Sequence, residues 1–417
     1  MNKLTPFFAF TATATAFTAV CMSSACAQTS QDPNASSSPY YYGASLGLTH
    51  LSNVYQTGQG NPSNSDWVAT EMLLAGLDQH YGRQRFYLNA SVQENQYQHN
   101  GSLNNSGYNI NGGLDWAAMD KLSGSINASA TRNLAPFNPG YLPNSTVKNI
   151  EDLDQINASV HYGLAGPLSL EGRAGYLSDN YSAALYQPYI YHQTYESLGV
   201  NYRISGALLV GMDARHTNID YPNYVDAITG KASGDRVNRN DFDLLAEWTA
   251  TGASFINGRL SVGRAVHSDA TASNFSGVTG TVAWRWQPTS KLQATTTLTR
   301  DTGLNTGFNG IGVPPAELNS VSTSASINSI YALTGKISLT GLIAVTRREL
   351  ANNNAGIVSG AASDTTYTLR VGEKWAIDRT FSLICQIEYD QRVGQATIYS
   401  TPFTSNTIGC TGQALFH

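Results

Sequence analysis

From Tyr40 to Phe416 the chain consists of segments of about twelve residues that alternate apolar and polar side chains. Each is long enough to cross a membrane as a tilted β-strand, which takes about nine to eleven residues. In residues 85–93, one face reads Phe, Leu, Ala and Val, and the other reads Arg, Tyr, Asn, Ser and Gln. Because side chains alternate between the two faces of a strand, each segment predicts one apolar and one hydrated face. A closed sheet with lipid outside and water inside needs such strands, and bacterial outer-membrane barrels have this arrangement.

The connections between these segments also alternate in length. Turns such as Tyr81-Gly82 and Ser205-Gly206 are short, whereas residues 134–152, 220–238 and 303–318 form long polar loops. Short periplasmic turns and long external loops are typical of outer-membrane barrels, and the segments add up to about eighteen strands, with sixteen as the alternative. The sequence therefore predicts an all-β fold, a transmembrane antiparallel up-and-down barrel over residues 40–417, with both ends in the periplasm.

Composition agrees with a barrel better than with a soluble domain. Charged residues make up 13% of the chain, about half of the usual share. After the N-terminus no apolar run is long enough for a transmembrane helix. The net charge is −5 and no cluster of Lys and Arg is present, so we do not expect a nucleic-acid partner.

The N-terminus predicts export from the cytoplasm. Lys3 precedes the apolar residues 7–20, and Ala25-Cys26-Ala27 fits a signal-peptidase site, which predicts cleavage after Ala27. A lipoprotein anchored at Cys26 is disfavoured because the usual Leu three residues before that cysteine is absent. Residues 1–27 are therefore interpreted as a signal peptide. The polar, Ser-rich residues 28–39 are interpreted as a disordered periplasmic lead-in, and the mature protein is expected in the bacterial outer membrane.

Two cysteines remain after this cleavage. Cys385 and Cys410 lie in the last two predicted strands, at similar heights and on the same face. An even pair in an oxidising compartment is compatible with a cross-strand disulfide. The alternative is that both are small hydrophobic side chains facing lipid.

Charged and aromatic residues on the hydrated faces are candidates for lining a pore. The candidates are Arg85, Tyr87, Glu171, Arg173, Arg203, Asp213, Arg215, Asp241, Asp243, Glu247, Arg285, Arg370, Lys374, Glu388, Asp390 and Arg392. Three strands place acid and base two residues apart on one face: Glu171/Arg173, Asp213/Arg215 and Glu388/Asp390/Arg392. These groups either create a transverse field across a pore or neutralise each other on a hydrated wall.

Tyrosine is abundant, with 23 residues. A tyrosine ring offers an apolar face to the C–H groups of a sugar and a hydroxyl to its oxygens. Candidates for such contacts are Tyr87 and Tyr195 on strands, and in loops Tyr186, Tyr189, Tyr191, Tyr221 and Tyr224.

An enzymatic function is the least favoured hypothesis. His50-Leu51-Ser52-Asn53 matches the H-x-S-N core of outer-membrane lipid-modifying enzymes, in which a histidine activates a serine. Val54 stands where such enzymes have Gly or Ala, and no orienting acid is identifiable. The eight histidines show no spacing typical of a metal site, and we expect no cofactor.

Two stretches resemble a known family when they are read together. They are residues 74–97, LAGLDQHYGRQRFYLNASVQENQY, and residues 107–137, GYNINGGLDWAAMDKLSGSINASATRNLAPF. They resemble EpsL-type proteins of exopolysaccharide biosynthesis, a branch of the porin-like outer-membrane β-barrels. The resemblance implies a role in secreting a surface polysaccharide, with periplasmic export components as partners. Phe416 is similar to the terminal aromatic that the barrel-assembly machinery recognises, although His417 follows it.

These observations favour an outer-membrane channel for export of a polysaccharide or oligosaccharide. A general diffusion porin without polymer specificity is the alternative, and a lipid-modifying enzyme using His50 and Ser52 is a more distant one.

Overall fold

The computed structural model describes residues 38–58, 65–118, 121–138, 144–163, 166–225, 231–269, 274–302, 320–350, 362–394 and 400–417. The predicted signal peptide, and residues 28–37 of the predicted lead-in, lie outside the described residues.

Eighteen antiparallel strands form one sheet, and pairing of β1 with β18 closes it into a barrel. The strands are β1 (Tyr40–Leu51), β2 (Asp66–Tyr81), β3 (Gln84–Tyr97), β4 (Asn105–Ala118), β5 (Leu122–Leu134), β6 (Ile150–Tyr162), β7 (Leu168–Tyr181), β8 (Tyr191–Arg203), β9 (Leu208–Tyr221), β10 (Asp235–Thr251), β11 (Ser254–His267), β12 (Phe275–Trp286), β13 (Leu292–Asp301), β14 (Ser320–Ala332), β15 (Ile337–Leu350), β16 (Ala362–Ala376), β17 (Phe381–Gly394) and β18 (Phe403–Phe416). This confirms the predicted fold and favours eighteen strands over sixteen.

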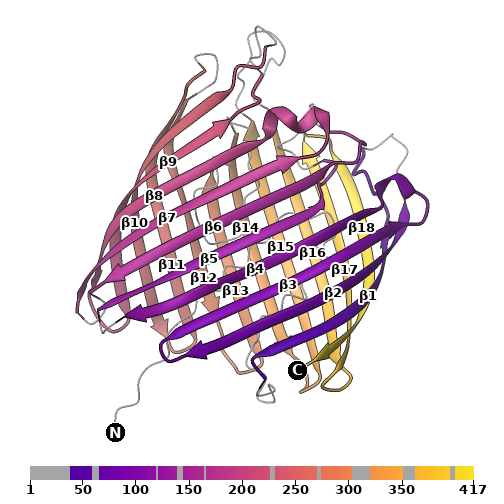
Figure 1. Ribbon diagram of the computed structural model, residues 1–417, viewed down its shortest axis with the longest axis horizontal. Coiled ribbons are helices and arrows are strands. Elements are labelled where there is room, and N and C mark those ends of the chain that lie inside the picture. The colour runs from indigo at the N-terminus through magenta and orange to yellow at the C-terminus, as the bar shows by residue number, and fades with distance from the viewer. Residues whose placement is uncertain are drawn as a thin grey trace.

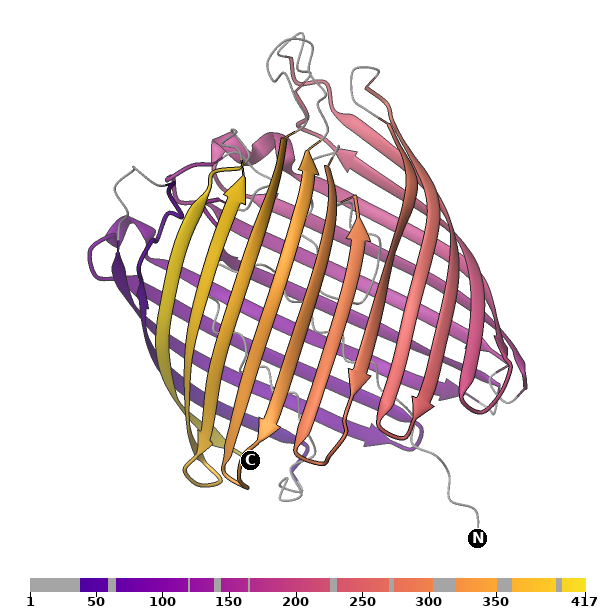
Figure 2. The ribbon, with the colours of Figure 1, turned by 180° about the vertical axis from the view of Figure 1, so that it is seen from behind.

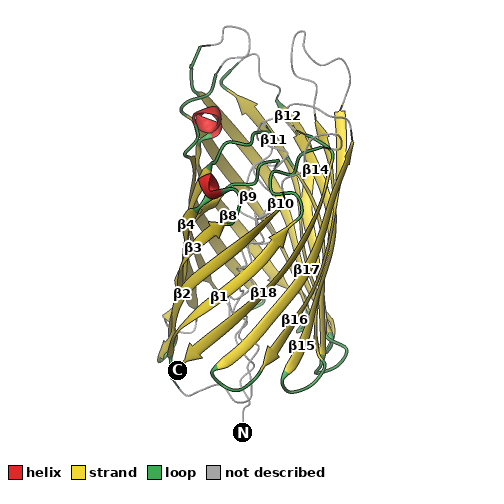
Figure 3. Ribbon diagram, turned by 90° about the vertical axis from the view of Figure 1, so that its right-hand side faces the viewer, coloured by secondary structure: helices red, strands yellow, loops and turns green. Residues whose placement is uncertain are grey.

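The strands are strongly inclined to the barrel axis and wrap around it (Figures 1 and 2). The described short turns and the C-terminal end of β18 lie at one end of the barrel. Two short 3-10 segments, η2 (Gly101–Leu103) and η3 (Ala184–Tyr189), lie at the opposite end, where the longer connections are (Figure 3). The two ends therefore have the predicted asymmetry between short turns and long loops.

The outer face of the barrel is apolar and exposed. Leu46, Leu73 and Leu198 have relative exposures of 67%, 62% and 71%. The apolar surface continues across the strands, since Leu73 lies opposite the exposed Val92 and Leu244 lies opposite the exposed Leu260. So large an apolar surface is stable only against lipid. The chain is therefore an outer-membrane β-barrel. No helix among the described residues is long and apolar enough to span a membrane.

Aromatic side chains lie near the strand ends on this outer face. Trp284 and Trp286 on β12 have ring centroids 6.0 Å apart, and Tyr42 stacks on Phe416 at 5.5 Å where β1 meets β18. Such rings are suited to the boundary between hydrocarbon and headgroups. The contact between Tyr42 and Phe416 also adds packing at the seam that closes the barrel.

Cys385 and Cys410 face each other directly across β17 and β18 and are joined by a disulfide, with their Cα atoms 4.1 Å apart. Their neighbours in register, Ile387 and Ile408, are exposed at 58% and 51% on the outer face. The disulfide therefore lies on the lipid-facing side of the wall.

The described turns at the short-turn end are closed by local hydrogen bonds. In the turn between β16 and β17, Asp378 Oδ1 accepts hydrogen bonds from the backbone N–H groups of Thr380 (2.8 Å) and Phe381 (2.7 Å). These hydrogen bonds stabilise the charged carboxylate and lower the pKa of Asp378. Gly82, with φ of +60°, occupies the left-handed position that the turn between β2 and β3 requires.

Candidate functional site

The inner face of the barrel carries all of the pore-lining candidates. Residues directly opposite each other on neighbouring strands point to the same side of a sheet. Following the strand register from the exposed apolar residues therefore identifies the lipid-facing side of each strand. Every candidate lies on the other side, which faces the lumen. Their role in lining a path for a solute stays a prediction.

A dense group of ion pairs covers the inner face of β9 to β11, and we call it the charge ladder: Asp213, Arg215, Arg239, Asp241, Asp243 and Arg259. Arg215 lies 3.2 Å from Asp241 and 3.4 Å from Asp243. Arg259 lies 3.7 Å from both Asp213 and Asp243. Arg239 donates from Nε to both oxygens of Asp241, at 3.0 and 2.8 Å. Each charge therefore has an opposite charge beside it.

Smaller sets of charged and polar pairs lie elsewhere on the inner face: on β16 and β17, on β7, and between β2 and β3. Arg370 forms an ion pair with Glu388, and Asp390 accepts a 2.6 Å hydrogen bond from Thr368. Glu171 and Arg173 pair on β7, and Arg85 pairs with Asp78 at 2.6 Å between β2 and β3. Charge pairs thus occur at several places around the wall.

Most of these partners differ from the predicted ones. Of the predicted same-strand groups, Glu171/Arg173 is in contact, whereas Arg215 reaches acids on β10 and Asp213 reaches Arg259 on β11. Glu388 likewise pairs with Arg370 on the neighbouring strand. Arg215 lies directly opposite Asp241, and Glu388 lies directly opposite Arg370. Directly opposite residues are about 5 Å apart, closer than the roughly 7 Å between residues two apart on one strand, which favours these cross-strand pairs. Asp213 and Arg259 are separated by β10, so this contact depends on the length of the arginine side chain.

The inner face of β1 to β8 is different because tyrosine, asparagine, serine and glycine predominate there. Tyr41 on β1 donates to Asn89 Oδ1 on β3 at 2.9 Å, and Tyr195 on β8 donates to Asn157 Oδ1 on β6 at 2.9 Å. Tyr87 on β3 donates to Asn127 on β5. We call this region, with its repeated tyrosine-to-asparagine hydrogen bonds, the tyrosine–asparagine wall.

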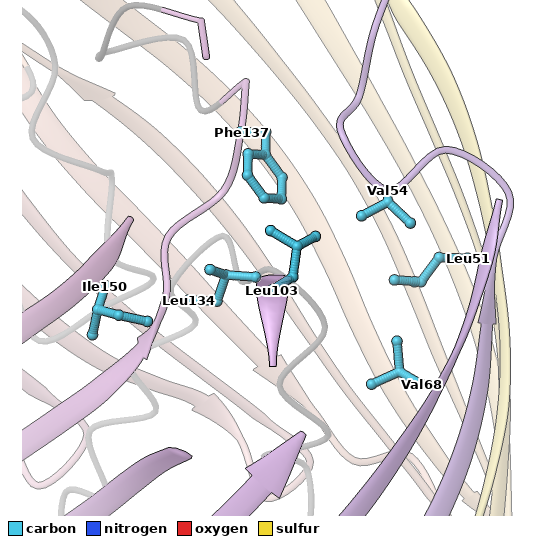
Figure 4. Close-up of a cluster of buried hydrophobic side chains, with 7 residues drawn as sticks. All are labelled: Leu51, Val54, Val68, Leu103, Leu134, Phe137 and Ile150. Atoms are coloured by element: carbon cyan, nitrogen blue, oxygen red, sulfur yellow. The ribbon is translucent and has the colours of Figure 1, made fainter. Parts of the chain in front are cut away.

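The end with the long loops is narrowed by chain that folds over it. Asn138, after β5, accepts a 2.7 Å hydrogen bond at Oδ1 from Arg392 on β17, and its Nδ2 donates to Thr401 O at 2.8 Å. Since β18, β1, β2, β3 and β4 lie between β5 and β17, this segment crosses part of the mouth. It is fixed there by a buried cluster (Figure 4) that consists of Leu51, Val54, Val68, Leu103, Leu134, Phe137 and Ile150.

The tyrosines that we expected to bind sugars from the loops are packed instead. Tyr186, Tyr191 and Tyr221 are 2%, 3% and 6% exposed. Tyr186 lies in a cluster with Tyr181 and Ile190. Tyr191 and Tyr221, with ring centroids 5.5 Å apart, belong to a cluster that includes Ile219 and Val237. The expectation that they bind sugars is therefore wrong for these three residues, because each of them buries its ring in one of these two clusters.

His50 and Ser52 are not arranged as a catalytic pair in the described contacts. The His50 ring packs on Trp67, with centroids 4.9 Å apart, on the outer face. The Ser52 hydroxyl accepts a 2.7 Å hydrogen bond from the backbone N–H of Asn406 on β18. The imidazole is thus used in ring packing and the hydroxyl in joining β1 to β18. Among the described residues, no group of three or more His, Cys, Asp and Glu side chains is placed to hold a metal ion.

No protein-family model matches the chain, and no curated protein matches it either. Solved structures similar to it include the outer membrane protein OpdK from Pseudomonas aeruginosa, with a TM-score of 0.47 and 12% identity over 90% of this chain and 99% of that one. OccK2 (OpdF) from the same organism has a TM-score of 0.47 and 11% identity over 90% of this chain and 98% of that one. OccAB3 from Acinetobacter baumannii has a TM-score of 0.47 and 9% identity over 90% of this chain and 99% of that one. The fold and location given above rest on the register and outer face of this chain itself.

Proposed function

We propose that this barrel is an outer-membrane channel through which a polysaccharide or oligosaccharide leaves the cell. The observation that carries the proposal is the tyrosine–asparagine wall on β1 to β8. It offers a solute uncharged hydroxyl and carboxamide groups together with ring surface. Hydroxyls, amides and aromatic faces match the hydroxyls and C–H faces of sugars.

The resemblance to EpsL-type proteins supports an exopolysaccharide as the solute. The matching stretches, residues 74–97 and 107–137, cover β3 and β5 and most of β4, which are strands of the tyrosine–asparagine wall. The proposed channel is passive, and the direction of transport follows the polymer gradient or periplasmic export components.

A blocking experiment tests this proposal. The purified barrel is inserted into planar bilayers and its single-channel current is recorded. We expect interruption by the polysaccharide that the producing cell secretes, but not by dextran or polyethylene glycol of equal size. A deletion strain is expected to retain the polymer in the periplasm. Normal secretion in the deletion strain would refute export through this channel.

A general diffusion porin is the second candidate, and the paired charges favour it. Arg85–Asp78, Arg173–Glu171 and Arg370–Glu388 each neutralise a charge within the wall, so these pairs present no field of a single sign to a passing solute. Equal interruption of the current by all polymers of one size would support this candidate over export.

A further inference from the structure

One row of residues crosses the inner face of six consecutive strands in a mirrored order. Following the register from β3 to β8, the row reads Tyr87, Gly113, Asn127, Asn157, Gly175, Tyr195. Each tyrosine extends over the adjacent glycine and donates its hydroxyl proton to the asparagine beyond it. The row therefore brings two tyrosines and two asparagines together from strands that are far apart in the sequence.

The glycines are what allow the rings to lie along the wall. A Cβ atom at Gly175 would collide with the Tyr195 ring, and a Cβ at Gly113 would come within 2.6 Å of the Tyr87 hydroxyl oxygen. Because these sites lack a side chain, the phenol occupies the space above the neighbouring strand. Both tyrosines are half-buried, so each ring packs on the wall and keeps part of its surface on the side of the lumen.

The hydrogen bonds leave a defined set of groups for a ligand. Each tyrosine hydroxyl uses its single proton on an asparagine Oδ1, which leaves its oxygen as an acceptor. Among the described residues, no protein atom accepts a hydrogen bond from Asn157 Nδ2, so this donor is available to a ligand. A carbohydrate hydroxyl both donates and accepts, and it can therefore bridge the Asn157 amide and the Tyr195 oxygen.

We propose that this row is a binding subsite for uncharged pyranose units. The two tyrosine rings pack against the C–H faces of the sugar, and the paired asparagines between them hydrogen-bond its hydroxyls. The inference rests on the proposed export function and assigns to it a place in the lumen. A neighbouring row repeats one half of the arrangement, since Tyr41 covers Gly76 and donates to Asn89 at 2.9 Å.

The orientation of the row suits a polymer. Tyr87 and Tyr195 lie on β3 and β8, five strand spacings of about 4.8 Å apart, so the row is about 24 Å long along the wall. Strands of such barrels tilt by about 40° from the axis, and a row perpendicular to them therefore rises by about 15 Å through the membrane. A sugar chain that follows the row thus moves along the channel as well as around it.

The test uses the whole mature barrel in planar bilayers, with maltohexaose and cellohexaose as probes. In the wild type we expect brief interruptions of the current by at least one of the two probes. Tyr195→Ala removes the ring and is expected to shorten the interruptions about three- to tenfold, as loss of one aromatic contact implies. Gly175→Ala keeps the tyrosine but pushes its ring off the wall, and it should shorten them similarly. Tyr195→Phe and Asn157→Ala should each have a smaller effect.

The matched control is Tyr176→Ala. Tyr176 is the neighbour of Gly175 but points to the outer face, where it is 41% exposed. We expect the probes to interrupt the current of this variant for as long as they interrupt the current of the wild type. Heat-dependent mobility in gels verifies that each variant is folded.

Interruptions of unchanged duration in folded Tyr195→Ala and Gly175→Ala variants would overturn the subsite. A conducting wild-type barrel that neither probe interrupts would overturn it as well. Neither outcome would refute the proposed export function, because that function is tested separately by polymer secretion in the deletion strain.

Discussion

Replacing Arg239 tests whether the charge ladder holds the wall of β10 together. Arg239 is 0% exposed, and it donates to both oxygens of Asp241, to Thr302 at 2.7 Å and to Thr279 at 3.0 Å. Its guanidinium also lies 3.7 Å from Asp301. Arg239→Met keeps much of the side-chain volume but removes the cation from all of these partners.

We expect this change to lower the free energy of unfolding by about 3–5 kcal/mol, the usual cost of removing one partner of a buried ion pair. The loss is expected toward the lower end of this range, because Arg215 remains 3.2 Å from Asp241. The measurement is urea unfolding of the refolded barrel in lipid vesicles, followed by tryptophan fluorescence. The double variant Arg239→Met/Asp241→Asn removes both charges of the pair, and it should be less damaging than the sum of the single changes by at least about 1 kcal/mol.

Arg264→Met is the matched control for this prediction. Arg264 lies on the neighbouring strand β11, on the outer face, and is exposed. A substitution there should change the free energy of unfolding by no more than about 0.5 kcal/mol. An Arg239→Met variant as stable as the control would refute the structural role assigned to the charge ladder.

Three further predictions follow from the mouth, the disulfide and the outer face. Arg392→Ala removes the hydrogen bonds to Asn138 and should raise single-channel conductance, and an unchanged conductance would show that this contact does not narrow the path. Reduction of the disulfide between Cys385 and Cys410, which are 25 residues apart, should lower the free energy of unfolding by about 3 kcal/mol, measured as above with and without reductant. Leu260→Arg puts a charge on the lipid face, where Leu260 is 50% exposed, and should cost about 2–4 kcal/mol of stability near mid-membrane, whereas an equally stable variant would contradict the assignment of this face to lipid.

The alternation of side chains was sufficient to predict which face each candidate occupies. The period of two is a property of the extended backbone, so Arg85, Glu171 and Lys374 could be placed on the hydrated side without knowledge of their neighbours. The number of strands followed from the same pattern together with the alternating connections.

Contacts between strands could not be predicted, because they depend on register. Alternation within a strand does not say which residue lies opposite, and a shift of two residues keeps both faces intact. The pairing of Arg215 with Asp241 and the row from Tyr87 to Tyr195 both depend on that register. Two members of the charge ladder were also missed. Arg239 directly follows the predicted loop 220–238, and Arg259 lies in a segment that alternates weakly.

The mouth clusters were unpredictable for a related reason. Tyr186, Tyr191 and Tyr221 lie in or beside polar loops, and sequence alone does not distinguish a tyrosine that reaches into water from one that packs on a neighbouring connection. Their burial follows from loops that fold over the barrel end, as the contact between Asn138 and Arg392 illustrates.

The mirrored order of the row on β3 to β8 has a consequence for the direction of movement. β3 and β8 run in opposite senses, so rotation by half a turn about a local axis normal to the sheet, between Asn127 and Asn157, exchanges one tyrosine with the other. A site with this pseudo-symmetry presents the same groups to a glycan that arrives with its reducing end first as to one that arrives with its non-reducing end first. In the proposed export function this row therefore gives the glycan no preferred direction, and the direction of net flow is set by whatever supplies the polymer from the periplasm.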